Sequence, residues 1–206
     1  MRRVRAYIGL GANVGDADAT LAAAIRSLAA LPGAELRGVS RLYVTAPVGV
    51  TFQPDFRNAV VALDVPAGPD PETGALALLV ALKRLERAFG RRKRRRWGPR
   101  ELDLDILAFG DADLAVERPP EGRPVDELGK SADGVSLLVV PHPEAPLRLF
   151  VLAPWADLAP ELVPAGWPET IAAATLLRQA VEGPAAVRPV ARWDGTSWAR
   201  SAAEPP

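Results

Sequence analysis

Two aspartates on one short apolar segment are the residues of this sequence best suited to chemistry. Asp103 and Asp105 alternate with Leu102, Leu104 and Ile106, and this period of two puts both carboxylates on the same face of a predicted strand. Side chains at positions i and i+2 of a strand lie roughly 6.5 to 7 Å apart, so two ionised carboxylates repel unless cations lie between them. Such oxygen ligands, completed by water and phosphate, suit a pair of Mg²⁺ ions that hold a polyphosphate.

A basic loop comes directly before these aspartates. Guanidinium groups match phosphate oxygens in a bidentate manner, and the loop supplies them from Arg91, Arg92, Arg96 and Arg100. Trp97 adds a flat cover, and Gly98-Pro99 indicates a turn.

Each half of this pattern has an ordinary alternative. An aspartate pair at i and i+2 also occurs on the solvated face of an antiparallel sheet, and a basic run also occurs as a solvated loop or a nucleic-acid or localisation patch. Because the two halves are joined through the turn at Gly98, they favour a magnesium–nucleotide site.

The composition limits the other function classes. The chain has 206 residues, 49% of them hydrophobic, which suits one globular domain over 1–206. Its 25 basic and 25 acidic residues cancel, whereas a dedicated nucleic-acid binder should be basic overall. The absence of Cys excludes disulfides and thiolate catalysis, and a single histidine, His142, excludes His-clustered metal sites. No apolar run approaches 18 residues, so we expect a soluble cytoplasmic protein without membrane contact.

The periodicity also predicts the elements that position the loop and the aspartates. Apolar patterns predict one helix capped by Asp16 or Asp18 and running to about Leu31, and a second from Pro71 to Phe89, ended by Gly90. Strands are predicted over 4–10, 36–43, 58–65 and the aspartate segment. The order strand, helix, strand, strand, helix, strand predicts an α+β, ferredoxin-like βαββαβ sandwich, with a mainly antiparallel sheet and its helices on one face.

The C-terminal half should add to this sandwich without forming a second domain. Residues 111–134 are polar and rich in Pro and Gly, which indicates a surface excursion with a hairpin element, followed by a strand over 135–140. Helical patterns over 147–158 and 170–181 predict a C-terminal helical extension. We expect an irregular tail over about 183–206.

One glycine pattern points toward a different function. Gly9, Gly11 and Gly15 lie between a predicted strand and a helix, as in a loose dinucleotide-binding fingerprint. A ribose-binding acid should close the next strand, but Thr45-Ala46-Pro47 follows there. A nicotinamide-dependent enzyme is therefore the weakest of the hypotheses.

The segment from Arg96 to Leu107 resembles the signature of the hydroxymethyl-dihydropterin pyrophosphokinase family of folate biosynthesis. Short blocks elsewhere are similar to the same family, including Gly11-Ala12-Asn13-Val14-Gly15-Asp16. The resemblance implies the ferredoxin-like fold and transfer of a diphosphoryl group from ATP to 6-hydroxymethyl-7,8-dihydropterin. It also implies binding of these two small molecules and of two Mg²⁺ ions. We expect no nucleic-acid partner, and a monomer with a weak dimer as the alternative.

The resemblance assigns site residues as follows. The catalytic residues would be Arg91, Arg92, Arg96, Trp97, Arg100, Asp103 and Asp105, and the two aspartates would hold the metal ions. The pterin would contact Thr45, Ala46, Val48, Phe56, Asn58, Trp97, Asp103 and Phe150. ATP would contact Glu86, Arg91, Arg100, Ile106, His142 and Arg148.

Several of these residues also have purely structural interpretations. Phe56 and Phe150 would stack on the pterin, although aromatic residues commonly pack in the core. His142 can be structural, and Glu86 can be an exposed salt-bridging residue. An oligonucleotide-binding module that uses Trp97 and the basic loop is the main alternative function, and it predicts salt-dependent binding without Mg²⁺.

Overall fold

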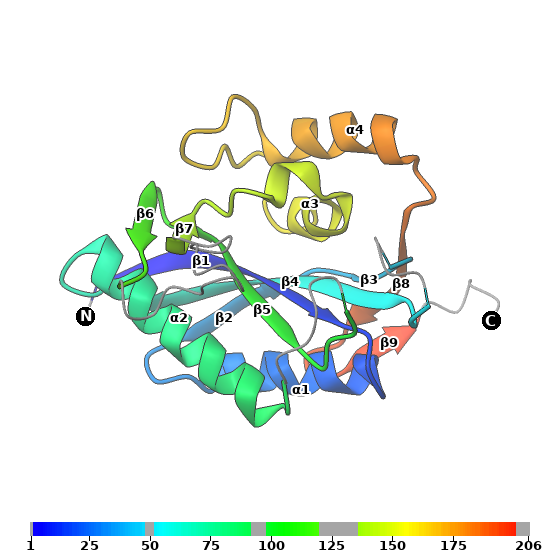
Figure 1. The fold of residues 1–206 in the computed structure, drawn as a ribbon, viewed down its shortest axis with the longest axis horizontal. Helices are drawn as coiled ribbons and strands as arrows, with labels where there is room; N and C mark the ends of the chain where they lie inside the picture. The colour runs from blue at the N-terminus through cyan, green and yellow to red at the C-terminus, as the bar shows by residue number, and fades with distance from the viewer. Residues whose placement is uncertain (1, 48–51, 92–97, 120–135, 201–206) are drawn as a thin grey trace, which may run out of the picture.

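An antiparallel sheet forms the centre of this protein, with two helices on one face and, on the other, one helix that carries a second on its outer side (Figure 1). The computed structural model describes residues 2–47, 52–91, 98–119 and 136–200. Within them, the main sheet contains β1 (Arg3–Ala12), β2 (Glu35–Val39), β3 (Leu42–Thr45), β4 (Phe56–Pro66), β5 (Asp103–Phe109), β8 (Val187–Trp193) and β9 (Trp198–Arg200). The helices are α1 (Ala17–Ala29), α2 (Pro71–Ala88), α3 (Leu149–Ala156) and α4 (Ile171–Glu182), with a 3₁₀ turn, η2 (Ala145–Leu147).

The strand order of the main sheet is β5-β1-β4-β3-β8-β9, and β2 also pairs with β4. The β1-to-β5 part confirms the ferredoxin-like arrangement, because β1 lies antiparallel between β4 and β5. One predicted strand, 36–43, is instead two strands that separate at Ser40 and Arg41. The Ser40 hydroxyl accepts a hydrogen bond from the Val60 N–H at this break, which replaces a ladder bond.

The two central helices begin and end at the residues that the sequence indicates. Asp16 caps α1 by accepting a hydrogen bond from the Ala19 N–H at 2.9 Å, and Asp70 caps α2 in the same way, directly before Pro71. Gly90, with a φ of 84°, follows the end of α2. These caps fix where α2 ends, and therefore where the basic loop begins.

The core is divided between the two faces of the sheet. Ile8 and Leu10 of β1 are buried with Leu21 of α1 and Leu82 of α2. On the opposite face, Trp155 of α3 is fully buried in a second cluster. The expectation of helices on one face therefore holds for α1 and α2, while α3 packs on the other face and α4 packs against α3 (Figure 1).

The C-terminal region differs from its predicted form. The expected irregular tail is wrong over 187–193 and 198–200, because β8 pairs with β3 and β9 pairs with β8. The burial of Val187 and Ala191 explains why these residues extend the sheet. The expected hairpin is confirmed, since β6 (Leu114–Glu117) pairs with β7 (Ser136–Val140). No helix among the described residues has the length and apolar character needed to cross a membrane.

Candidate active site

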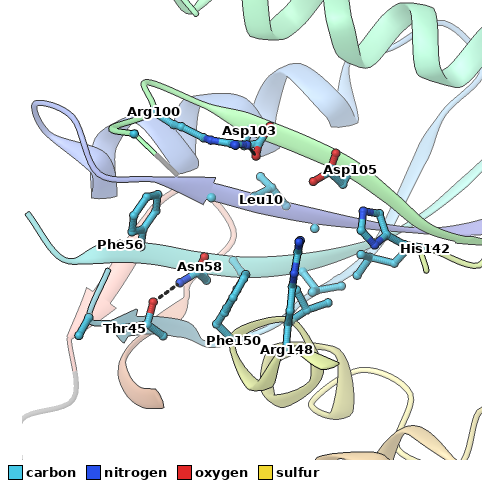
Figure 2. A pocket seen from close by; sticks show the side chains of 18 residues that line it. Leu10, Thr45, Phe56, Asn58, Arg100, Asp103, Asp105, His142, Arg148 and Phe150 are labelled. Atoms are coloured by element: carbon cyan, nitrogen blue, oxygen red, sulfur yellow. Dashed lines mark hydrogen bonds and ion pairs between the residues drawn. The ribbon is translucent and has the colours of Figure 1, made fainter. Parts of the chain in front are cut away.

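A cavity of about 180 Å³ lies on the α3 face of the sheet, over β1, β4 and β5 (Figure 2). Its floor is built by strand register. Gly9 pairs with Asp105 and Gly11 pairs with Asp103, so a residue without a side chain lies beside each carboxylate. A Cβ atom at Gly9 would lie 3.3 Å from Leu107 Cδ2, and one at Gly11 would lie 3.4 Å from Asn58 Oδ1. The glycines thus keep the cavity open next to the two aspartates.

This register also explains the glycine pattern that resembled a dinucleotide fingerprint. Gly9 and Gly11 lie inside β1 and pair with β4 on one side and β5 on the other. A dinucleotide fingerprint instead needs its glycines in the turn between a strand and a helix. The structure therefore gives no support to a nicotinamide site at this position.

Asp103 and Asp105 both line the cavity, as the alternation predicts (Figure 2). The Asp103 side chain is 17% exposed and lies between two arginines. Arg100 Nη1 pairs with Asp103 Oδ2, and Arg91 Nη1 lies 2.7 Å from Oδ1. Although Oδ1 is close to Arg91, it is buried and accepts no hydrogen bond of acceptable geometry from the residues that the structure describes. This oxygen therefore lies in a site rich in positive charge.

The second aspartate has a wetter environment. The Asp105 side chain is 42% exposed, and Lys83 Nζ lies 3.8 Å from its Oδ1. No cluster of three or more metal-ligating side chains occurs among the described residues. Two carboxylates fit a Mg²⁺ site that is completed by water and substrate phosphate, because this ion rarely uses an all-protein cage. The oxygen donors present therefore suit magnesium.

Glu86 supports this strand from behind and does not line the cavity. Its side chain is only 3% exposed, so the alternative interpretation as an exposed salt bridge is wrong. Glu86 Oε1 accepts hydrogen bonds from the Leu104 N–H at 2.8 Å and from Lys83 Nζ at 2.7 Å, and it pairs with Arg91 Nη1. One buried carboxylate thus connects α2, the first residue of the basic loop and the strand that carries the aspartates.

The end of the cavity predicted for the pterin holds an amide and two aromatic rings. Asn58 Nδ2 donates a hydrogen bond to Thr45 Oγ1 at 2.9 Å, and both side chains are buried. Phe56 enters from β4 and Phe150 from the start of α3 (Figure 2). Ala46 also lines this end. The structure therefore brings together the described residues of the predicted pterin set.

The opposite end holds His142 and Arg148, which also line the cavity. The His142 N–H donates to the Leu107 carbonyl at 3.0 Å, and its Nδ1 accepts from the Glu144 N–H at 3.2 Å. A neutral ring with this acceptor carries its proton on Nε2. Burial lowers the pKa of His142 below its ordinary value, against the opposing influence of Asp105.

The remaining predicted residues are not all at the cavity. The Ile106 side chain is buried in the core on the α2 face, opposite the aspartates, so an ATP contact there could come only from its backbone. Val48, Arg92, Arg96 and Trp97 lie outside the described residues.

Two residues that support the site from outside the cavity lining were not predicted from the sequence. Lys83 lies three positions before Glu86 on α2, a spacing that places both on one face of a helix. Asn13 is 2% exposed and hydrogen-bonds to two segments at the cavity. Asn13 belongs to the segment from Gly11 to Asp16 that resembles the family, but a lone amide gives no indication of its partners.

Comparisons with known proteins agree with this geometry. The family model described as 7,8-dihydro-6-hydroxymethylpterin-pyrophosphokinase (HPPK) matches residues 7–160. A 2-amino-4-hydroxy-6-hydroxymethyldihydropteridine pyrophosphokinase of Methylorubrum extorquens is 41% identical over 162 residues, which is 79% of this chain and 87% of the relative. The protein of the same name from Pseudomonas aeruginosa is 40% identical over 172 residues, covering 82% and 91% of the two chains.

Solved structures show the same fold at lower identity. A crystal structure of an HPPK-DHPS protein in complex with substrates matches with a TM-score of 0.68 and 14% identity, covering 97% of this chain and 48% of that one. A Plasmodium falciparum HPPK-DHPS triple mutant matches with a TM-score of 0.70, also at 14% identity and with the same coverage. This chain spans about half the length of these solved chains, and the likeness concerns the fold alone.

Proposed function

Because the chain belongs to the 7,8-dihydro-6-hydroxymethylpterin-pyrophosphokinase family, we propose that it transfers a diphosphoryl group from ATP to the hydroxymethyl oxygen of 6-hydroxymethyl-7,8-dihydropterin. The products are AMP and the pterin diphosphate, an intermediate of folate biosynthesis. The observation that carries this proposal is the pair Asp103 and Asp105 on the cavity face of β5, next to two arginines.

The aspartates would hold two Mg²⁺ ions against the triphosphate. When bound, these ions would neutralise phosphate charge and make the β-phosphorus more electrophilic. Arg91 and Arg100 contact Asp103 in the present structure. Phosphate oxygens match their forked N–H groups as well as a carboxylate does, and a triphosphate offers more of them, so we infer that both arginines exchange Asp103 for phosphate when ATP enters. This exchange would free the Asp103 oxygens for metal.

The arginines would also stabilise the transferring group. Positive charge in a water-poor site is most effective where negative charge develops in the transition state. His142 would donate its Nε2 proton to a phosphate oxygen, and Arg148 would pair with another. By resemblance alone, we propose phosphate contacts for Arg92 and Arg96, and for Trp97 a flat ring that covers the bound substrates.

The pterin would occupy the end of the cavity between Phe56 and Phe150. Both rings can stack on a flat heterocycle, and Asn58 can pair with its amino-pyrimidinone edge through a donor and an acceptor. Thr45 already binds the Asn58 amide, so it would hold that amide in one orientation. The hydroxymethyl group would then point toward Asp103 and the β-phosphorus. We propose that residues 1–206 act as one domain and as a monomer.

A product assay tests the proposal. The purified protein would be incubated with ATP, Mg²⁺ and reduced hydroxymethylpterin, and AMP would be separated from ADP by chromatography. The proposal predicts AMP that forms only when the pterin is present. ADP would indicate an ordinary kinase, and the absence of any nucleotide product, with working controls, would favour the oligonucleotide-binding alternative.

A further inference from the structure

Asn13 connects two segments that lie far from it in the sequence. Its Nδ2 donates to Gln53 Oε1 and to the Pro54 carbonyl, both at 3.0 Å. Its Oδ1 accepts from the Arg100 N–H at 2.8 Å, and its own N–H donates to the Arg100 carbonyl at 3.0 Å. The residue is 2% exposed, so its amide is shielded from water although Gln53 and Pro54 are partly accessible.

The two connected segments both lead to residues that line the cavity, Phe56 and Arg100. Pro54 comes two residues before Phe56, which lies at the proposed pterin end. Arg100 comes three residues before Asp103 and pairs with this proposed metal ligand. Asn13 itself does not line the cavity. It therefore touches the supports of both proposed substrates and neither substrate.

The chemistry of the amide group suits this connection. The Pro54 carbonyl can only accept and the Arg100 N–H can only donate, so their positions fix which end of the amide faces each segment. A side chain that serves both needs a donor and an acceptor at the same distance from the backbone. An aspartate here would keep the acceptor for Arg100 and lose both donors to the other segment.

We propose that Asn13 is a positioning residue that couples the two halves of the site. By holding the Gln53–Pro54 segment and the Arg100 turn to one common group, it makes the position of each depend on the other. Binding at one end then prepares the other end. The identity of the two coupled ligands rests on the proposed function. The physical connection of the two segments through Asn13 is independent of it.

A first experiment needs no ligand. Amide hydrogen exchange would be compared in wild type, Asn13→Ala and Asn13→Asp over residues 52–58 and 98–104. In Asn13→Ala, exchange should become about fivefold faster or more in both segments, because each lost bond contributes about 1 kcal/mol. In Asn13→Asp, the increase should fall mainly on 52–58, since the acceptor for Arg100 remains.

A matched control separates this effect from general loss of stability. Thr175 is a buried polar residue whose hydroxyl donates to the Ile171 carbonyl within α4, away from the cavity lining. Thr175→Ala should leave exchange in both segments unchanged. Faster exchange in only one segment of Asn13→Ala, or equal increases in the Thr175 variant, would overturn the connection.

The second experiment measures coupling directly. The first ligand is an ATP analogue with a methylene group between its α and β phosphorus atoms, and its binding would be measured with Mg²⁺ in the presence and absence of 6-hydroxymethylpterin. Binding of the pterin would then be measured in the presence and absence of the analogue. We expect each ligand to strengthen the other about fivefold or more in wild type, within the usual range for coupled sites. In Asn13→Ala, each ligand should change the affinity for the other by less than about twofold, while each ligand alone binds nearly as in wild type.

The two failures can be distinguished. If wild type binds neither ligand, the proposed function fails, and hydrogen exchange still decides whether Asn13 connects the segments. If both ligands bind but the coupling factor is near one in wild type, or is unchanged in folded Asn13 variants, the coupling proposal fails. Asn13→Asp keeps one of the side-chain connections, so it provides the test if Asn13→Ala does not fold.

Discussion

Asp103 and Asp105 lie on one face of one strand, yet their surroundings differ. Asp103 is 17% exposed and lies between Arg91 and Arg100, whereas Asp105 is 42% exposed and has Lys83 at 3.8 Å. Neutralising Asp103 leaves two arginines with a weaker partner, whereas neutralising Asp105 changes a group that water already reaches. The proposed metal role treats them alike, but their contributions to stability should be unequal.

The isosteric variants Asp103→Asn and Asp105→Asn test this difference. Both should lower turnover more than about a hundredfold, because each loses a carboxylate for metal. Only Asp103→Asn should also lower the free energy of unfolding, by about 1 to 3 kcal/mol, as measured by urea denaturation without ligand. The exposed Asp111 provides the control, and Asp111→Asn should change neither quantity. Near-normal turnover in both test variants would refute the metal assignment.

His142 gives a pH dependence that can be assigned without ambiguity, because it is the only histidine in the chain. Burial lowers its pKa in the folded protein below the ordinary value of 6.5. As the pH falls through about 6.5, the unfolded chain therefore takes up a proton that the folded protein does not. The free energy of unfolding should decrease over this window, with a slope of at most about 1.4 kcal/mol per pH unit from this group.

The measurement is denaturation of the protein without Mg²⁺ or ATP at several pH values, compared with His142→Asn. The difference between the two curves should narrow as the pH falls below about 6.5, because only the wild type loses stability through this group. A constant difference between the two curves would contradict a lowered pKa in the folded state.

At the scale of elements, a buried carboxylate joins α2 to β5 in addition to the apolar packing between them. Glu86 connects the Leu104 N–H of β5 with Lys83 of α2 and Arg91 at the start of the basic loop. The strand that carries the aspartates and the loop that carries the arginines therefore share one anchor. Its loss should affect the geometry of both, although Glu86 does not line the cavity.

Glu86→Ala should lower the free energy of unfolding by about 3 to 5 kcal/mol, because it leaves two cations without their buried partner. Glu86→Gln should cost less, since an amide oxygen can still accept from the Leu104 N–H. Urea denaturation of the two variants measures this. An equal loss in both would mean that the charge has no special role, and an unchanged Glu86→Ala would contradict the anchor.

The elements also show what sequence patterns can predict. The alternation around Asp103, the cap at Asp16 and the helix start at Pro71 are local, and the structure follows them. The pairing of Glu86 with residues of another element depends on register between α2 and β5, which no local pattern encodes. The same holds for Asn13, whose three partner residues are 40 to 87 positions away.

The sequence predicted two regions wrongly, residues 36–43 and the C-terminal tail, because their structure also depends on contacts with other elements. The segment 36–43 is apolar enough for one strand, but the tertiary bond from the Val60 N–H to Ser40 divides it. The tail composition, rich in Pro, Ala and Arg, suggested irregular structure, yet an available edge of β3 orders Val187 to Trp193. Tertiary context decided both outcomes.

At the scale of the whole molecule, β8 and β9 extend the sheet beyond β3, the strand that ends in Thr45 of the site. Trp193 and Trp198 pack edge to face with centroids 5.2 Å apart, and Arg26 of α1 donates to the Thr196 carbonyl at 2.6 Å. The family match ends at residue 160, so α4, β8 and β9 lie beyond it. We infer that they nevertheless support the site.

Truncation after Glu182 tests this inference. It uncovers the edge of β3 and removes the burial of Val187 and Ala191, so the melting temperature should fall by about 10 °C or more. Arg192→Ala, at an exposed position of β8, should shift it by no more than about 2 °C. A truncated protein with the wild-type melting temperature would show that the strands contribute nothing to stability.

The central claim is that the whole diphosphoryl group moves from ATP to the pterin. The most direct test uses two preparations of ATP, one carrying radioactive phosphorus at the β position and one at the γ position, each reacted with the protein, Mg²⁺ and reduced hydroxymethylpterin. We predict that both labels appear in the pterin product and that the nucleotide product is unlabelled AMP. Transfer of the γ label alone, with the β label retained in ADP, would contradict the proposed reaction.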